Sequence, residues 1–121
     1  MIKKILPYLL AALMLLGAYG HIANPDFYGP MVPAFIPLDI ANWISVVVEA
    51  AIGIGLIIPS TRKMAARGFF ILMIVFLPIH IWDVIQETPV VGSRRAALIR
   101  LLVQFLLIYA GWYVQRSSQA K

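Results

Sequence analysis

Residues 39–58, DIANWISVVVEAAIGIGLII, form the stretch of sequence that decides the fold. A helix rises about 1.5 Å per residue, so roughly 20 residues cross the ~30 Å hydrocarbon core of a bilayer. This stretch has that length and is almost entirely apolar. Its interior polar side chains, Asn42, Ser45 and Glu49, recur at intervals of three and four, which places them on one helical face. The stretch predicts a membrane-spanning helix with one polar face.

Three other segments are apolar over a similar length: 4–22, 65–86 and 96–115. The chain of 121 residues is 62% hydrophobic and 12% charged, which is outside the usual range of soluble domains. We therefore expect one all-α integral membrane domain over residues 1–121, an antiparallel bundle of four transmembrane helices. The first segment follows Lys3 and Lys4 and also resembles a signal peptide. Because Tyr19, Gly20 and His21 lead directly into the next connection, we expect this segment to be kept as a helix and not removed as a signal peptide.

The Lys and Arg residues of the connections predict the orientation, because cytoplasmic loops hold the excess of them. The connection 87–95 carries Arg94 and Arg95, and the connection 22–38 carries no basic residue. We therefore expect both termini in the cytoplasm. The placement of basic residues on the cytoplasmic side mostly explains the net charge of +5. These residues do not cluster with aromatic residues, so no nucleic-acid partner is expected. The basic residues of the expected cytoplasmic side are Lys3, Lys4, Arg62, Lys63, Arg67, Arg116 and Lys121.

The connection 22–37, IANPDFYGPMVPAFIP, is rich in proline and aromatic residues. Each proline removes a backbone donor and restricts the residue before it, so no regular helix is expected here. Irregular backbone cannot face lipid. Two interpretations remain open: an interfacial loop anchored by Phe27, Tyr28 and Phe35, or a lid folded over the mouth of the bundle. The connection PSTRK at 59–63 is interpreted as a tight polar turn that sets topology.

Polar side chains inside membrane spans are costly and therefore informative. The depth of each side chain in the membrane can be estimated from its distance along an antiparallel helix, at about 1.5 Å per residue from the outer end of each span. By this estimate Glu49 and Gln104 lie deepest. Side chains from three helices would then converge on one cavity in the outer half of the bundle, with His21, Asn42 and Asp83 near its rim. The predicted ligand-pocket residues are Glu49, His80, Arg100, Gln104, Ser45, Asn42, His21 and Asp83.

Glu49 is the deepest ionisable side chain in this prediction. An unpaired carboxylate in hydrocarbon costs several kcal/mol, so Glu49 should hydrogen-bond to a neighbour. We expect an ion pair between Arg100 and Glu49. Two interpretations of the polar cluster stay open: a structural clasp that fixes helix register, and a functional pocket.

The sequence leans against an enzyme and identifies no catalytic residue. It has no cysteine, no nucleotide-binding loop and no nucleophile beside a base. No metal site is predicted, because neither histidine has a second histidine four residues away. A proton relay through His80 and Asp83 is a further hypothesis. Pro78 is expected to kink the third span just before His80.

Small residues in 50–55 and 17–20 predict close helix contacts. These contacts could serve packing within the bundle, a homo-oligomer or the helix of another membrane protein. The sequence does not separate these uses.

The chain resembles the DoxX-like family of small four-helix bacterial membrane proteins in four stretches, which are GHIANPDFYGPMVPAFIP, ISVVVEAAIGIGLIIPSTRKMAARG, FLPIHIWD and IRLLVQFLLIYAGW. The similarity runs from about Gly20 to Trp112 and follows the order of the family. It implies a multi-pass protein of the bacterial cytoplasmic (inner) membrane. The positions that match the family pattern are His21, Pro33, Pro37, Glu49, Gly53, Pro59, Arg62, Pro78, Arg100 and Gln104.

The polar cluster and the resemblance together leave three functions open. Some relatives are described as subunits of a thiosulfate:quinone oxidoreductase, and a distant animal relative is a chaperone for receptor assembly. We expect an accessory or small-ligand binding subunit with an intramembrane polar pocket for a quinone or a lipid-like molecule. The alternatives are an assembly factor that binds another membrane protein, and a component of a quinone-linked membrane oxidoreductase. The expected partners are the lipid bilayer and either another membrane protein or further copies of this chain.

Overall fold

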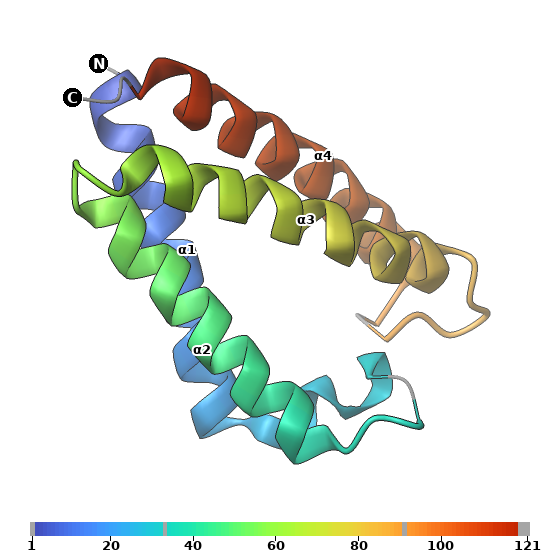
Figure 1. The fold of residues 1–121 in the computed structure, drawn as a ribbon. Helices are drawn as coiled ribbons and strands as arrows, with labels where there is room; N and C mark the ends of the chain where they lie inside the picture. Colours follow the sequence, from blue (N-terminus) through green and yellow to red (C-terminus); the bar gives the residue numbers. More distant parts are fainter. Residues whose placement is uncertain (1, 33, 91, 119–121) are drawn as a thin grey trace.

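A computed structural model describes residues 2–32, 34–90 and 92–118, and it is helical without strands over these residues (Figure 1). The all-α prediction is therefore confirmed. Pro33, one of the positions that match the family pattern, lies outside the described residues. The helices are α1 (Ile2–Ala23), the 3-10 helix η1 (Pro25–Met31), α2 (Leu38–Ile57), α3 (Arg62–Val84) and α4 (Arg94–Ser117).

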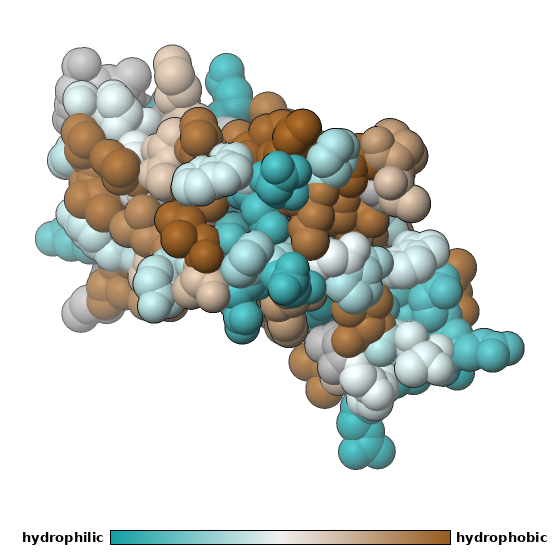
Figure 2. All heavy atoms as spheres, turned by 90° about the horizontal axis from the view of Figure 1, so that it is seen from below, coloured by the Kyte–Doolittle hydropathy of each residue, from teal (hydrophilic) through white to brown (hydrophobic). Residues whose placement is uncertain are grey.

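The four long helices are each long and apolar enough to cross a membrane. Many of their large apolar side chains point outward, and the side chains of Leu16, Val47 and Leu106 are 69%, 66% and 67% exposed. Figure 2 shows hydrophobic residues spread over the face that it presents, with hydrophilic residues near its middle. Long helices with apolar side chains on their outward faces are typical of membrane spans. These features suggest a multi-pass membrane protein.

The long helices form two pairs, α1 with α2 and α3 with α4 (Figure 1). The pairs meet near the chain termini and diverge toward the opposite end, where η1 lies between them. The main apolar core lies where the pairs meet, and it includes Leu10, Met14, Leu56, Phe69 and Val114. The two pairs are therefore packed against each other at one end of the molecule and separate toward the other.

Glycines allow the helices to approach closely at three places. A Cβ on Gly53 would lie 2.8 Å from Leu15 of α1, and one on Gly55 would lie 2.8 Å from Ala65 of α3. A Cβ on Gly111 of α4 would lie 2.8 Å from a ring carbon of Phe69 and 3.2 Å from the backbone of Phe70. Of the uses that the sequence left open for small residues, these glycines serve packing within the chain.

The segment Pro25–Met31 corrects the prediction that prolines would exclude a regular helix from this connection, because it forms the 3-10 helix η1. Pro25 occupies the first position, where a missing backbone N–H costs nothing, and its fixed φ suits a helical turn. A 3-10 helix needs only short i→i+3 bonds, such as that from Phe27 N to Asn24 O at 3.1 Å. The proline-rich connection is therefore ordered by local bonds.

The α2–α3 turn does more than the predicted setting of topology, because Arg62 caps the end of α2. Its Nε donates to Leu56 O at 2.8 Å, and its Nη2 donates to Ile57 O at 3.0 Å and to Tyr8 Oη at 3.2 Å. The guanidinium carbon also lies 5.1 Å from the centre of the Tyr8 ring. Carbonyls at a helix C-terminus lack partners within the helix. Arg62 supplies these partners and ties α2 to α1.

We expect the substitution Arg62→Ala to lower the free energy of unfolding by about 1 kcal/mol, because the last carbonyls of α2 lose charged donors. Unfolding of the purified protein in mixed micelles, followed by circular dichroism, measures the change. Lys63→Ala is the matched control, since this neighbouring basic residue takes no part in the cap. Equal stability of the two variants would contradict the capping role.

Candidate functional site

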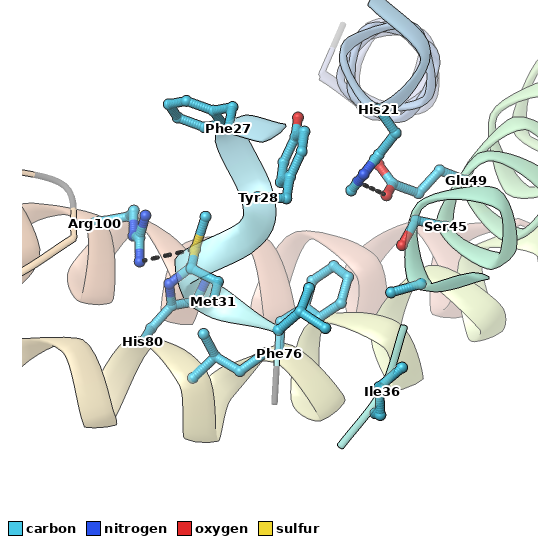
Figure 3. Close-up of a pocket in the computed structure, with 13 residues that line it drawn as sticks. His21, Phe27, Tyr28, Met31, Ile36, Ser45, Glu49, Phe76, His80 and Arg100 are labelled. Atoms are coloured by element: carbon cyan, nitrogen blue, oxygen red, sulfur yellow. Dashed lines mark hydrogen bonds and ion pairs between the residues drawn. The ribbon is translucent and has the colours of Figure 1, made fainter. Parts of the chain in front are cut away.

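A cavity of about 370 Å³ lies between the two helix pairs at their open end (Figure 3). Side chains from all four long helices and η1 line it. Of the eight residues predicted from the sequence, the structure brings five to this cavity. These five are His21, Ser45, Glu49, His80 and Arg100, and the other lining residues are Phe27, Tyr28, Met31, Val32, Ile36, Ala41, Phe76 and Ile79.

The proline-rich connection forms one wall of the cavity. Tyr28 and Met31 of η1 point toward the helices in Figure 3, and Val32 and Ile36 follow them along the wall. Phe35, by contrast, is 85% exposed and does not line this cavity. The geometry favours the lid interpretation of this connection for η1, while Phe35 fits an interfacial anchor.

His21 connects α1 with α2 through two side chains of α2. Its Nε2 lies 3.1 Å from Oε2 of Glu49, and its Nδ1 lies 2.7 Å from Oδ1 of Asn42. Asn42 in turn donates from Nδ2 to the carbonyl of Pro25 at 3.1 Å. Glu49 and Asn42 are buried, at 5% exposure each. The three side chains form a chain of bonds that ends at the start of η1.

The direction of these bonds places one proton between His21 and Glu49. Because the Asn42 amide nitrogen donates to Pro25, its oxygen faces His21 and must accept from Nδ1–H. The remaining nitrogen, Nε2, then has two possible roles. It accepts a hydrogen bond from a neutral Glu49, or it is protonated and donates a hydrogen bond to a Glu49 carboxylate. The pair holds one proton and no net charge in both forms. That proton lies between Nε2 and Oε2, and the Nδ1 proton is donated to Asn42, so the pair can only accept a hydrogen bond from a further group.

Two features of α1 and η1 hold this pair in place. The Glu49 carboxylate occupies the space that a Cβ on Gly17 would fill, so the glycine lets the side chain lie against α1. Tyr28 stacks on His21, with ring centres 3.8 Å apart and planes 20° apart. Burial, reinforced by the nearby Glu49 carboxylate, raises the pKa of the Tyr28 phenol above its usual value. Tyr28 therefore remains a hydrogen-bond donor at neutral pH.

The expected ion pair between Arg100 and Glu49 is wrong. Arg100 Nη2 lies 3.2 Å from Oδ2 of Asp83, and the other oxygen of Asp83 accepts from the backbone N–H of Val90 at 2.6 Å. Asp83 is fully buried and does not line the cavity, although the sequence placed it near the rim. Arg100 and Asp83 lie on the packed pair α3–α4, whereas Glu49 lies across the cavity against α1.

Gln104 also departs from the prediction, because it does not form a cavity floor with Glu49. Its Nε2 donates to the carbonyl of Met73 at 2.7 Å, inside the contact between α3 and α4. His21, predicted above Glu49 at the rim, contacts Glu49 directly. The depth estimate assumed four helices parallel to one axis. The divergence of the two pairs breaks that assumption and separates the predicted single cluster into two.

Two buried nitrogens at the α3–α4 side of the cavity have no hydrogen-bond partner within the described part of the chain: Nδ1 of His80 and Nε of Arg100. Arg100 also directs Nη2 at the sulfur of Met31, 3.9 Å away (Figure 3). A thioether is a weak acceptor. Buried polar groups in proteins are almost always bonded, so this wall of the cavity has an unused donor at Arg100 and an unused nitrogen at His80, whose role depends on the tautomer of the ring.

Three residues at the site were missed from the sequence in these roles. Gly17 was noted only as a small packing residue, Tyr28 only as an interfacial aromatic, and Met31 not at all. The glycine at 17 and the tyrosine at 28 belong to segments whose relative placement depends on the turn into η1. Met31 carries no signal of its own, since methionine is a common filler of apolar space.

A second cavity, of about 450 Å³, adjoins the first. The two share Met31, Val32 and Ile79 as lining residues. The remaining lining residues of the second cavity are Pro30, Ala34, Pro78 and Trp82. An apolar space therefore continues from the polar groups along η1 and α3.

Comparison with known protein families finds one match, over residues 10–115, to a family described as a domain of unknown function, DUF8561. This match covers α2 and α3 and most of α1 and α4. No curated protein and no solved structure matches the chain. The match covers most of the sequence, so the chain belongs to this family.

Proposed function

We propose that this member of the DUF8561 family is a multi-pass membrane protein that binds a small amphiphile, either a quinone or a lipid-like molecule, in the cavity between its helix pairs. The observation that carries the proposal is the composition of the cavity wall. Six polar or ionisable side chains meet there with an apolar remainder: those of His21, Tyr28, Ser45, Glu49, His80 and Arg100, which come from the four long helices and η1. Ligand sites typically combine a mostly apolar wall with a few placed polar groups.

The membrane placement is supported by the four apolar helices and by the basic residues. Lys3, Lys4 and Arg62 lie at the end where the helix pairs meet, and the excess of Lys and Arg assigns that end to the cytoplasm. The four helices then form an antiparallel bundle with the cavity open toward the outer side. The resemblance to DoxX-like proteins supports the bacterial inner membrane and is the reason to include quinones among the ligands.

The assembly-factor alternative receives less support from the packing. Gly53 and Gly55 belong to the small residues predicted as contact points for a partner helix, and the side chains of Leu15 and Ala65 of this chain lie against them. A structural clasp would explain the bonds of His21 and Asn42. It would not explain the unpartnered nitrogens of His80 and Arg100 beside an open cavity.

The test fills the cavity without touching its polar groups. We expect protein purified in native lipid to retain a bound quinone or lipid. The variant Ala41→Trp should retain at least about tenfold less of this species, because the indole occupies the lining position of Ala41. Extraction followed by mass spectrometry measures the bound species. Glu49→Ala and Arg100→Ala should lose the same species.

The control is Val47→Trp, which adds the same indole to the exposed side of α2, where Val47 is 66% exposed. This variant should retain the bound species at the wild-type level. If Ala41→Trp folds normally and keeps that species at the level of Val47→Trp, the cavity is not the binding site and the proposal is refuted.

A further inference from the structure

The α3–α4 wall of the cavity has donors in excess of acceptors. Nη2 of Arg100 donates to Asp83 and also lies 3.9 Å from the sulfur of Met31. Nε of Arg100 has no acceptor among the described residues. Nδ1 of His80 is also without a partner there, and it donates or accepts according to the tautomer of the ring. An oxygen atom in place of the Met31 sulfur would accept more strongly from Arg100. The wall is thus built for an incoming acceptor.

The charges around the cavity cancel. Asp83, fully buried, neutralises Arg100 at 3.2 Å. His21 and Glu49 hold one proton between them and carry no net charge. A carboxylate or phosphate head group would be desolvated in the cavity, where the guanidinium of Arg100 is already paired with Asp83. Among the residues that line the cavity, the one carboxylate available to an ammonium head is that of Glu49, which already contacts His21 at 3.1 Å. Both would lose hydration energy without compensation.

The rest of the cavity accommodates an apolar body. Phe76, Ile79 and Val32 line it, and the second cavity continues beyond Val32 and Ile79 toward Trp82. The tail of a membrane amphiphile is already out of water in the bilayer, so this space accommodates the tail while the head group decides which ligand is preferred. Met31 lies between the donors and this apolar space and is unbranched, so it can change rotamer to admit a head group.

We propose that the ligand is an amphiphile with an uncharged, carbonyl-type head, whose oxygen accepts from Arg100 in place of the Met31 thioether. This inference rests on the proposed function and adds the chemical class of the ligand. It excludes free fatty acids, phospholipid phosphates and amines as the preferred head groups. It admits amides, esters and quinones.

The experiment compares decanamide with decanoate, which share a tail and differ in the charge of the head. Each is titrated into purified protein in lipid nanodiscs, at a pH where decanoate is ionised. The Ala41→Trp protein gives the background from partition into lipid. We expect decanamide to bind the wild-type protein at least about tenfold more tightly than decanoate.

Two variants test the two parts of the argument. In Asp83→Asn, Arg100 loses its counter-charge. This variant should therefore bind decanoate about tenfold more tightly than decanamide. Met31→Leu leaves the ion pair intact and removes the competing sulfur at similar volume. It should bind decanamide about threefold more tightly and keep the preference for the uncharged head. The second variant keeps the proposal testable if the first fails to fold.

The outcomes separate this inference from the function on which it rests. If decanoate binds the wild-type protein as tightly as decanamide, the assignment of an uncharged head is refuted while binding in the cavity stands. If Met31→Leu weakens decanamide binding, the replacement of the thioether is refuted. If neither probe binds above the Ala41→Trp background and no native species is lost in that variant, both proposals fail.

Discussion

The substitution Asp83→Ala is expected to lower the free energy of unfolding by about 3 kcal/mol, because it leaves Arg100 as an unpaired charge in the α3–α4 contact. Asp83 is fully buried, bonds to Arg100 at 3.2 Å and accepts from Val90 N at 2.6 Å. Its removal therefore also strands a backbone donor. Titration with sodium dodecyl sulfate, with helix content followed by circular dichroism, measures the loss.

The control for Asp83→Ala is the double substitution Asp83→Ala with Arg100→Met. Removing both charges eliminates the unpaired guanidinium, so the double variant should recover most of the lost stability. A double variant no more stable than Asp83→Ala would show that the loss comes from packing or from Val90, and the proposed importance of the charge would be wrong.

The substitution Gly111→Ala is expected to cost about 1–3 kcal/mol by forcing α4 away from α3. The added Cβ would lie 2.8 Å from Phe69 and 3.2 Å from two backbone atoms of Phe70. Phe69 is fully buried and backbone atoms cannot rotate away, so the helices themselves must move. The same unfolding titration measures the effect.

Gly68→Ala is the matched control, because Gly68 also lies inside a helix but a Cβ there would find Ile52 at an ordinary 3.5 Å. Alanine favours helix more than glycine does, so this variant should be as stable as the wild type or more stable by up to about 1 kcal/mol. If Gly111→Ala behaves in the same way, the close contact between α3 and α4 is not required.

The composition of the cavity could be predicted in part. Glu49, Ser45, His80, Arg100 and His21 stand out in the sequence because polar side chains are rare in apolar helices, and all five line the cavity. Their partners were predicted less well. Arg100 lies four residues before Gln104, and both face α3, but only Arg100 reaches the cavity while Gln104 is held by the carbonyl of Met73.

The sequence by itself determined the four helices, since 18 or more apolar residues between polar turns leave few other structures. It also determined which residues are chemically unusual for their surroundings. Only the tertiary structure decided that His21 pairs with Glu49 and Asp83 with Arg100. Ion-pair partners depend on distances of a few ångströms. Each of these ion pairs lies within one packed pair of helices, and the divergence of the two helix pairs keeps Arg100 away from Glu49. This arrangement involves contacts between residues far apart in the sequence, such as Gly53 with Leu15 and Gly111 with Phe69, so no local pattern in residues 39–58 is sufficient to encode it.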